Sequence, residues 1–343
     1  MKIALCSSSA PFINGGYRNI VEWLERVLQE SGHQVERVYL PQVETPNLLM
    51  QQMMAYRWID LDAADRIICF RPGAHLIPHQ HKILWFIHHI RAFYDLWDTP
   101  YRGFPDDRIH RGIRDALRKA DTNAMQEAKA VFANSRVVVN RLKLFNNVDS
   151  TVLYPPLLEP EQFFYRDQND EILCICRIEH HKRQHLLIEA MKYTQSSVKL
   201  RICGTGSEDY FQELCNLVLA YGLEDRVWVE SRWITQQEKI TLLSNCLAVA
   251  YLPLDEDSYG YPSLEGSHSS KAILTTSDAG GVLELVSDGM NGLVAEPTPE
   301  ALGQAMDQLH MDARRTAEMG KNAAARVKEL KISWPHVVQE LLA

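Results

Sequence analysis

Short apolar runs separated by amphipathic stretches fill the first half of the chain. Runs of this length, bounded by polar residues, predict the buried strands of a parallel sheet. They are Ile3–Cys6, Gln34–Leu40, Arg66–Phe70, Ile83–Ile87, Ala130–Ala133 and Thr151–Leu153. Between the first two, apolar residues recur at helical spacing from Ile20 to Leu28, and Gly32 follows as a stop signal. This pattern predicts a right-handed βαβ unit at the amino terminus.

A second series of apolar runs begins after Tyr154, Pro155 and Pro156, where the prolines disfavour helix and residues 159–170 are polar and acidic. Its predicted strands are Ile172–Cys176, Val198–Cys203, Val227–Val229, Leu247–Leu252 and Ala272–Thr276. A chain of 343 residues also exceeds the size at which one core usually keeps growing. We therefore expect an α/β protein with two doubly wound, Rossmann-like domains, 1–158 and 159–330. Their ligands should bind in a cleft at the carboxyl ends of the strands.

Composition limits the partners that this protein can have. The net charge of -8 argues against a nucleic-acid binder, because phosphate neutralisation needs an excess of Lys and Arg. No stretch approaches the roughly 20 apolar residues of a spanning helix, and Met1–Ala10 lacks the basic start of a signal peptide. We expect a cytoplasmic protein, at most peripheral at the inner face of a membrane.

The seven cysteines are odd in number and scattered, so they predict packing thiols in a reducing compartment and no disulfide framework. Cys174 and Cys176 share one face of a predicted strand. No second pair supplies the ligand spacing of a zinc site. We expect no metal site.

Two cations follow the first strand of the second series. Arg177 and Lys182 enclose Ile178-Glu179-His180-His181, and a helical stretch follows. This resembles the Arg-x4-Lys element of glycosyltransferase family 4, which grips the donor diphosphate. Two cations that converge on a pyrophosphate stabilise the bound donor and the charge on the leaving nucleotide. Taken alone, such a pair is also typical of solvated surface charge.

The segment Asp257-Ser258-Tyr259-Gly260-Tyr261-Pro262-Ser263-Leu264-Glu265 resembles the Glu-x7-Glu element of the same family. Pro262 suits the first turn of a helix, whose free amides near Ser263 and Leu264 would face the donor phosphates. The resemblance implies that Glu265 holds the ribose hydroxyls and that Asp257, with the backbone around Gly260, faces the hexose. The spacing places Asp257 at the first acidic position, where the family element has Glu. Glu256 lies one residue earlier and is the alternative for that contact. The donor-binding residues so predicted are Trp233, Tyr259, Gly260, Tyr261, Ser263, Leu264 and Glu265.

Two pairs of glycines lie in the second half. Gly280-Gly281, with Glu284 three residues on, resembles the Gly-Gly-x2-Glu turn of the family, and Asn291–Val294 would be the return after it. Glycine lets the backbone approach a ligand or a neighbouring strand closely. The stretch Gly204-Thr205-Gly206 lacks the third glycine of a dinucleotide fingerprint and follows the second strand of its domain. We interpret it as a loop and not as a dehydrogenase motif.

In the first half, Gly15 and Gly16 follow the first strand and open the first helix, like the glycine loop of the family. A plain tight turn is the alternative. His88 and His89 end the Ile83–Ile87 run, and the stretch that follows resembles a bacterial subgroup in which a histidine at this strand end faces the reacting sugar. We predict His88 for this role, with His89 in reserve.

The resemblance covers nearly the whole chain and implies the two-domain GT-B fold, with residues 331–343 returning to the first domain. It also implies a retaining hexosyltransferase that needs no metal, uses a nucleotide sugar (UDP-glucose by family frequency) and serves polysaccharide biosynthesis with a glycan or lipid-linked acceptor. The catalytic residues would be His88, Arg177, Lys182 and Asp257. A non-catalytic nucleotide-sugar-binding protein and a GT-B sugar-nucleotide epimerase are the alternatives.

A helix is predicted over residues 106–119, where Asp106 and Asp107 mark a start. Arg108, Arg111, Arg114 and Arg118 would share one face, and Ile109, Ile113 and Leu117 another. A basic face of this kind could dock on anionic lipid. A solvated helix face is the alternative, since Asp107 and Asp115 dilute the charge.

Overall fold

The computed structural model describes residues 1–9, 16–42 and 45–343, and the chain divides into two compact units. Unit 1 comprises Met1–Pro156 and Ile332–Ala343, and unit 2 comprises Leu157–Lys331. The boundaries expected from the prolines and from the carboxyl-terminal return fall within two residues of these limits. Gly15 lies outside the described residues, so the prediction for it stays a prediction.

Unit 1 is built on a six-stranded sheet in which every neighbouring pair is parallel. The strands are β1 (Lys2–Ser9), β2 (Gln34–Pro41), β3 (Arg66–Cys69), β4 (Lys82–Phe86), β5 (Ala130–Ala133) and β6 (Thr151–Val152). Their order is β2-β1-β3-β4-β5-β6, so the chain starts in the interior of the sheet and winds in both directions. Each apolar run predicted from the first half forms one of these strands, because both faces of the sheet are covered.

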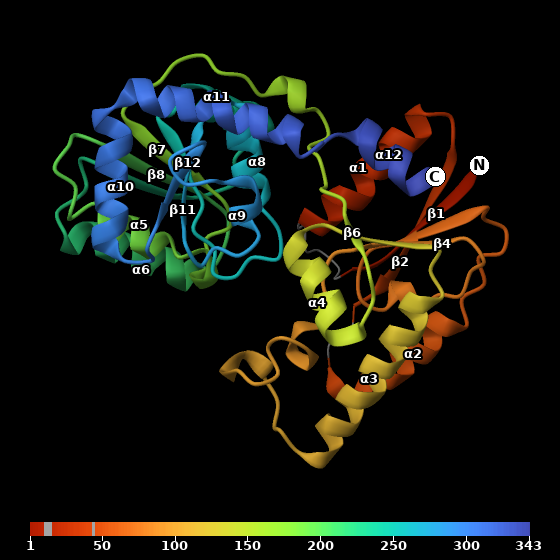
Figure 1. Ribbon diagram of the computed structural model, residues 1–343. Helices are drawn as coiled ribbons and strands as arrows, with labels where there is room; N and C mark the ends of the chain where they lie inside the picture. The colour runs from red at the N-terminus through yellow and green to blue at the C-terminus, as the bar shows by residue number, and fades with distance from the viewer. Residues whose placement is uncertain (10–15, 43–44) are drawn as a thin grey trace. The chain divides into compact units, whose positions relative to one another are not determined.

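Five α-helices accompany this sheet: α1 (Gly16–Glu30), α2 (Leu49–Arg57), α3 (Arg108–Gln126), α4 (Arg136–Asn146) and α12 (Trp334–Leu342). Polar side chains start several of them, since Asp107 caps α3 and Ser135 caps α4 through backbone amides of the first turn. The last helix lies beside α1 (Figure 1), and Trp334 packs edge-on against Trp85 of β4 with ring centroids 6.4 Å apart. The predicted return of the carboxyl terminus to this unit is therefore present.

Unit 2 contains a second six-stranded parallel sheet, ordered β12-β11-β10-β7-β8-β9. Its strands are β7 (Glu171–Ile175), β8 (Lys199–Gly204), β9 (Val227–Ser231), β10 (Ala248–Ala250), β11 (Ala272–Thr276) and β12 (Gly292–Ala295). The interpretation of Asn291–Val294 as a return was wrong in one respect, because Gly292–Ala295 is a strand paired with β11. Its strand signal is weak because Gly292 and Ala295 are residue types with low strand propensity.

The helices of unit 2 are α5 (Gln184–Ala190), α6 (Glu208–Ala220), α7 (Gln236–Asn245), α8 (Tyr261–His268), α9 (Val282–Leu285), α10 (Pro299–Met311) and α11 (Ala313–Glu329). Apolar side chains from one face of the sheet and from α5, α6, α10 and α11 form one core. In Figure 1, α10 crosses beside α5 and α11 runs over α8, as the packing of these pairs requires. The core fixes the strands, and their carboxyl-terminal loops carry the polar residues.

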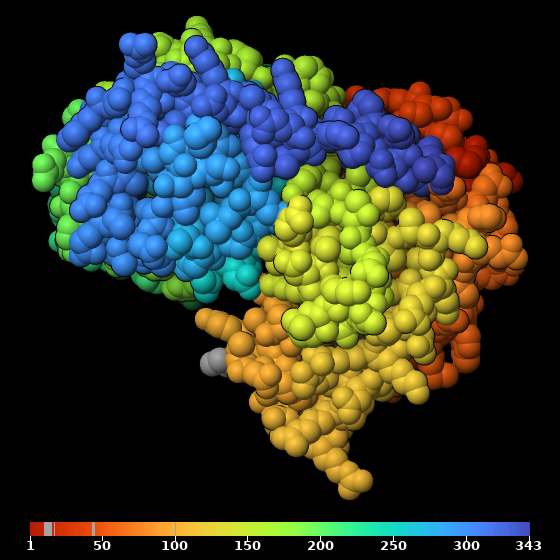
Figure 2. All heavy atoms as spheres, in the orientation of Figure 1, coloured from red at the N-terminus to blue at the C-terminus, as the bar shows by residue number. Residues whose placement is uncertain are grey.

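The helix predicted near residues 106–119 is α3, and its start projects from unit 1 as a tip in Figures 1 and 2. The predicted basic face needs correction. Arg114 stacks 4.3 Å over the Trp97 ring, and Arg118 lies over the ring of Tyr94. Burial lowers the pKa of Arg118. Half of the cations therefore hold aromatic side chains in place.

Ile109 was also assigned to the wrong surroundings. It was expected on the packed apolar face, but it is 67% exposed because the first turn of α3 extends past the rest of unit 1. Arg108 and Arg111 beside it are exposed, and Arg111 pairs with Asp106 at 2.6 Å. Lipid docking through this helix remains a prediction that rests on two exposed cations.

Candidate functional site

The carboxyl ends of β7, β10 and β11 lie side by side in unit 2, because these strands are neighbours in a parallel sheet. The loops that follow them contain Arg177 and Lys182, the acidic run 255–257, and Asp278. In open parallel sheets, ligands bind at this edge. The topology thus gathers the predicted donor residues from separate parts of the chain.

Lys182 is the best-defined of these residues. Its side chain is 8% exposed, and its ammonium donates to the Tyr251 hydroxyl at 2.8 Å and to the Glu256 carboxylate. The Tyr251 hydroxyl also donates to Glu256, at 2.8 Å. Burial alone would raise the pKa of Glu256, but the Lys182 charge and these hydrogen bonds outweigh it and lower the pKa. Lys182 and Glu256 therefore form an ion pair in which the lysine is buried and the carboxylate is 26% exposed.

This pairing bears on the choice between Asp257 and Glu256. The carboxylate that meets the buried lysine is Glu256, one residue before the position expected from spacing. Asp257 is half-buried and follows it in the same loop. The two acids therefore differ in surroundings, and the assignment of Asp257 to the hexose stays a prediction.

Arg177 and Lys182 do not share a partner in the structure. The Arg177 side chain is 55% exposed, and its guanidinium pairs with Glu179 at 2.5 Å. The Arg177 carbonyl accepts a hydrogen bond from the side-chain amide of Gln184 at 2.8 Å. This bond holds the backbone of Arg177 but not its side chain. Convergence of the two cations would require Arg177 to exchange Glu179 for a more highly charged anion, such as a diphosphate.

The backbone of the loop that contains Arg177 packs closely against Gly204 and Gly206. A Cβ on Gly204 would lie 1.9 Å from the Cys176 carbonyl oxygen, and one on Gly206 would lie 2.0 Å from that of Ile178. The Ile178 amide donates to the Thr205 carbonyl at 3.0 Å. These glycines serve backbone packing next to the candidate site. Gly206 lies in a loop as predicted, whereas Gly204 is the last residue of β8.

Gly280 and Gly281 support the acidic loop in the same way. Gly280 has φ +66°, and a Cβ there would lie 2.5 Å from the Glu256 carbonyl oxygen. The Gly281 amide donates to that oxygen at 2.8 Å. A Cβ on Gly281 would lie 2.7 Å from the Ser258 backbone. The glycine turn therefore approaches a neighbouring loop, and through it sets the position of Glu256.

Arg183, the residue after Lys182, links three loops through contacts that the sequence did not reveal. Its guanidinium donates two hydrogen bonds of 2.7 Å to the Asp278 carboxylate and others to the Leu252 and Pro253 carbonyls. It thereby ties together the loops after β7, β10 and β11. The only sequence signal was a second cation next to Lys182, which alone does not reveal the partner.

Helix α8 begins as predicted, with Gly260 as its cap and Pro262 in its first turn. Ser263, Leu264 and Glu265 are buried. The side chain of Leu264 is part of the core, and its backbone amide donates to the Gly260 carbonyl at 3.3 Å, so the predicted contact of Leu264 with the donor is not supported. Gly260 has φ +68°. A Cβ there would lie 2.2 Å from the Tyr251 ring, which forces glycine at this position.

Three aromatic residues of the predicted donor site lie in different surroundings. Tyr259 is 1% exposed, so its ring supports the loop from inside and could not stack on a ligand. Burial raises the pKa of Tyr261, the first residue of α8, so its hydroxyl stays neutral. Trp233, which follows β9, is 73% exposed and presents its indole to solvent.

Glu265 has a partner that the sequence did not reveal. The ammonium of Lys239, from α7, donates to one oxygen of the Glu265 carboxylate, and the two side chains are 19% and 10% exposed. Burial raises the pKa of Glu265, and the Lys239 charge opposes that rise. The ion pair therefore offsets part of the cost of burying the Glu265 carboxylate.

In unit 1, the two histidines after β4 differ sharply. His89 is 2% exposed, its Nε2 faces the Asn146 side-chain oxygen at 2.9 Å, and burial lowers its pKa to about 4. It is a neutral core residue. His88 is half-buried, and its Nδ1 donates to the His89 carbonyl at 2.7 Å. Of the two, only His88 retains surface for a ligand.

A buried polar network lies next to His89. Asp121 of α3 accepts hydrogen bonds from His75 Nε2 at 2.8 Å and from the Tyr94 hydroxyl at 2.6 Å. Tyr94 in turn packs on the His89 ring, with centroids 4.2 Å apart. The network anchors the segment that follows β4 and therefore the backbone that orients His88. Gly16, the other described residue of the glycine loop, is the first residue of α1.

Within residues 1–9, 16–42 and 45–343, no three His, Cys, Asp or Glu side chains gather in a way that could hold a metal ion. The seven cysteines all have free thiols. None of the described helices is both long and apolar enough to cross a membrane.

The chain is similar to known proteins in sequence and in fold. Residues 159–326 match the family of glycosyl transferases group 1. Human alpha-1,3/1,6-mannosyltransferase ALG2 is 26% identical over 298 residues, which are 79% of this chain and 69% of that protein. Residues 159–326, which make up most of unit 2, therefore carry the region that defines the glycosyl transferases group 1.

Solved structures show the fold of this chain. Anabaena HepE in complex with UDP and glucose has a TM-score of 0.67 and 18% identity, covering 98% of this chain and 99% of that one. Sucrose-phosphate synthase from Thermosynechococcus elongatus has a TM-score of 0.75 and 15% identity, covering 98% and 97%. The fold class is GT-B, as the sequence predicted.

Proposed function

We propose that this protein is a glycosyltransferase that moves a hexose, with retained configuration, from a nucleoside diphosphate sugar to a glycan or lipid-linked acceptor in polysaccharide biosynthesis. The observation that carries the proposal is the buried Lys182, held by Glu256 and Tyr251 at the carboxyl edge of the sheet. UDP-glucose is the donor that we favour, since HepE has been solved with UDP, glucose and UDP-glucose. The mannosyltransferase relatives make mannose the competing sugar.

In this proposal unit 2 binds the nucleotide. Lys182 and Arg177 carry the charge that develops on the leaving diphosphate, and the backbone amides at the start of α8, up to Ser263, contact its phosphate oxygens. Glu265 accepts hydrogen bonds from the ribose hydroxyls. The exposed Trp233 indole offers a flat surface for the base.

Sugar transfer needs protein groups that bind the hexose as well as protein groups that stabilise the leaving diphosphate. We assign Asp257 and the backbone at Gly260 to the hexose hydroxyls, and His88 to the orientation of the sugar. The acceptor oxygen bonds to the anomeric carbon on the face from which the phosphate oxygen leaves. That phosphate oxygen takes the acceptor proton, so UDP departs and no protein carboxylate forms an intermediate. No metal is required, because protein cations hold the diphosphate.

The test measures UDP affinity by calorimetry and turnover on UDP-glucose, UDP-galactose and GDP-mannose. Lys182→Met should lower turnover roughly 100- to 1,000-fold, the loss typical of one group that stabilises developing charge. Glu265→Ala should mainly weaken UDP binding. Melting curves of both variants report whether they fold. If both folded variants bind UDP and turn over like the parent, the donor-site assignment is wrong. UDP binding without transfer or hydrolysis of any donor would point to a binding protein, and an epimerised donor to an epimerase.

A further inference from the structure

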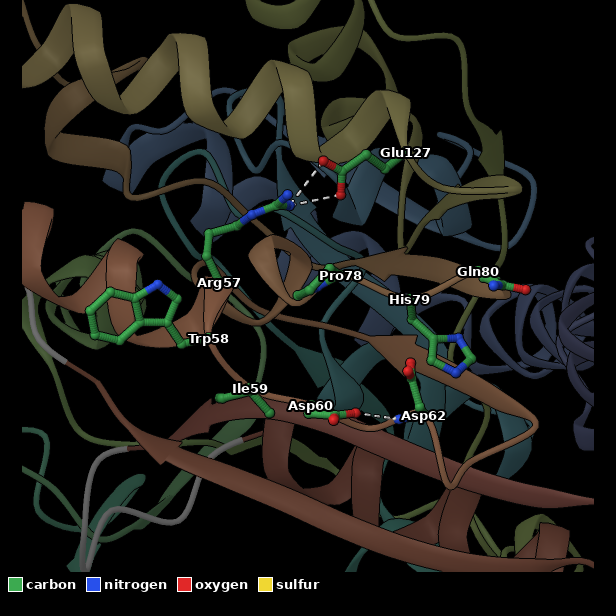
Figure 3. A pocket seen from close by; sticks show the side chains of 9 residues that line it. All are labelled: Arg57, Trp58, Ile59, Asp60, Asp62, Pro78, His79, Gln80 and Glu127. Carbon is green, nitrogen blue, oxygen red and sulfur yellow. Dashed lines mark hydrogen bonds and ion pairs between the residues drawn. The ribbon is translucent and has the colours of Figure 1, made fainter.

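Unit 1 has a groove between α2 and α3 that the proposed transfer reaction does not use. It consists of two adjoining hollows, of about 360 and 520 Å³, which share Arg57, Trp58 and Glu127. Figure 3 shows the larger hollow, with the Trp58 indole at one side and Asp60, Asp62 and His79 at the other. We call the whole the α2 groove.

The smaller hollow is apolar. Met50, Met54 and Trp58 recur every four residues along α2 and are 40%, 54% and 79% exposed. Ala120 and Ala124 of α3 form the facing wall. Side chains at this spacing share one helix face. An exposed apolar face of this kind usually marks a docking surface, and methionine adapts its shape to a partner.

The larger hollow adds negative charge. Asp60 and Asp62 are exposed, and no cation of the described residues lies within ion-pair distance of either carboxylate. The Asp62 amide donates to Asp60 at 2.9 Å, which fixes the turn between them. By contrast, Glu127 is neutralised by Arg57 at 2.8 Å and by the buried Lys82 at 2.8 Å. The net charge of the residues that line the α2 groove is therefore negative.

The position of the groove separates it from the substrate edge. Asp62, Gln80 and Glu127 precede β3, β4 and β5, whereas His88 follows β4. The groove therefore opens at the amino-terminal edge of the sheet, and ligands of open parallel sheets bind at the opposite edge.

We propose that the α2 groove docks a basic amphipathic helix of a second protein. Its apolar side chains would fill the hollow beside Met50 and Met54 and cover Trp58, and a Lys or Arg further along would meet Asp60 and Asp62. A bilayer offers no protruding side chain for a hollow, and anionic lipid would meet like charge at the two aspartates. A second copy placed symmetrically would oppose one acidic groove to another.

The test uses a labelled helical peptide of Leu and Lys with leucines at i, i+3, i+4 and i+7, and a matched peptide with Glu in place of Lys. Fluorescence anisotropy against the full chain should show saturable binding of the basic peptide that weakens at high salt. Trp58→Ser and the double variant Asp60→Lys, Asp62→Lys should each lower its affinity at least tenfold. The control is Leu144→Ser, which removes a 76% exposed apolar side chain elsewhere on unit 1 and should change nothing.

Donor hydrolysis should stay unchanged in all these variants, so failure of this proposal is separable from failure of the proposed function. The proposal is overturned if the basic peptide does not bind at 1 mM, if it binds the Trp58→Ser variant like the parent, or if both peptides bind equally. It is also overturned if Trp58→Ser abolishes self-association in sedimentation or binding to phosphatidylglycerol vesicles. Those outcomes would assign the groove to a second copy or to lipid.

Discussion

Substitution of Lys239 by Met would leave the buried Glu265 carboxylate without its cation. Removing one partner of a buried ion pair costs about 3–5 kcal/mol. Because 19% of the Lys239 side chain is exposed, water can replace part of the lost contact, and we expect the lower end, about 3 kcal/mol near pH 8. For a domain of this size that loss corresponds to a melting temperature lower by roughly 6 to 12 °C.

The effect should depend on pH in a defined direction. The pKa of Glu265 is raised above its ordinary value of 4.5 even with Lys239 present, so the folded state binds this proton more readily than the unfolded state. Its contribution to stability is therefore greatest below pH 4.5 and is lost as the pH rises through the folded-state pKa. Loss of Lys239 raises that pKa further, so the variant should be much more destabilised at pH 8 than at pH 5.

Thermal melts of the parent and of Lys239→Met between pH 5 and 8 measure this difference. Two controls separate charge from packing: Lys239→Arg should keep the parental profile, and the double variant Lys239→Met, Glu265→Gln should remove the pH dependence. An equal fall in the melting temperature of Lys239→Met at both pH values, or no fall, would show that Lys239 does not stabilise the Glu265 carboxylate. UDP affinity of the same variant should drop most at low pH, where Glu265 is protonated and accepts fewer hydrogen bonds.

Three further expectations concern the acidic loop, the metal and the membrane. Gly280→Ala should cost at least about 2 kcal/mol by denaturant unfolding and weaken UDP binding, because its Cβ would meet the Glu256 backbone at 2.5 Å. Gly289→Ala, with φ +68° and no atom nearer than 3.9 Å, should cost only the backbone term of about 1 kcal/mol, and equal losses would refute the contact. Transfer activity should survive EDTA, and an absolute need for manganese would contradict the role given to the protein cations. Reversal of charge at Arg108 and Arg111 should lower co-sedimentation with anionic vesicles at low salt if α3 docks on lipid, and unchanged binding would exclude this helix.

Some elements of this protein are determined by the sequence alone. The eleven predicted apolar runs all became strands, because a buried parallel strand needs apolar side chains on both faces and the run itself carries that signal. Asp107 and Pro262 marked helix starts correctly, since capping and the fixed φ of proline act within one turn. The strand β12 was not predicted, because it begins with glycine and ends with alanine, which are both uncommon in strands.

Tertiary structure decided which charges meet. Lys182 and Glu256 are 74 residues apart in the chain, and Arg183 and Asp278 are 95 apart. Each pair forms because β7, β10 and β11 are neighbours in the sheet, a fact about strand order that no local pattern contains. The same holds for Arg118, which helical spacing placed on a basic face and which packing placed over the Tyr94 ring. Sequence periodicity specifies which side of an element is apolar, whereas the partner of a polar group is specified only when distant loops are brought together.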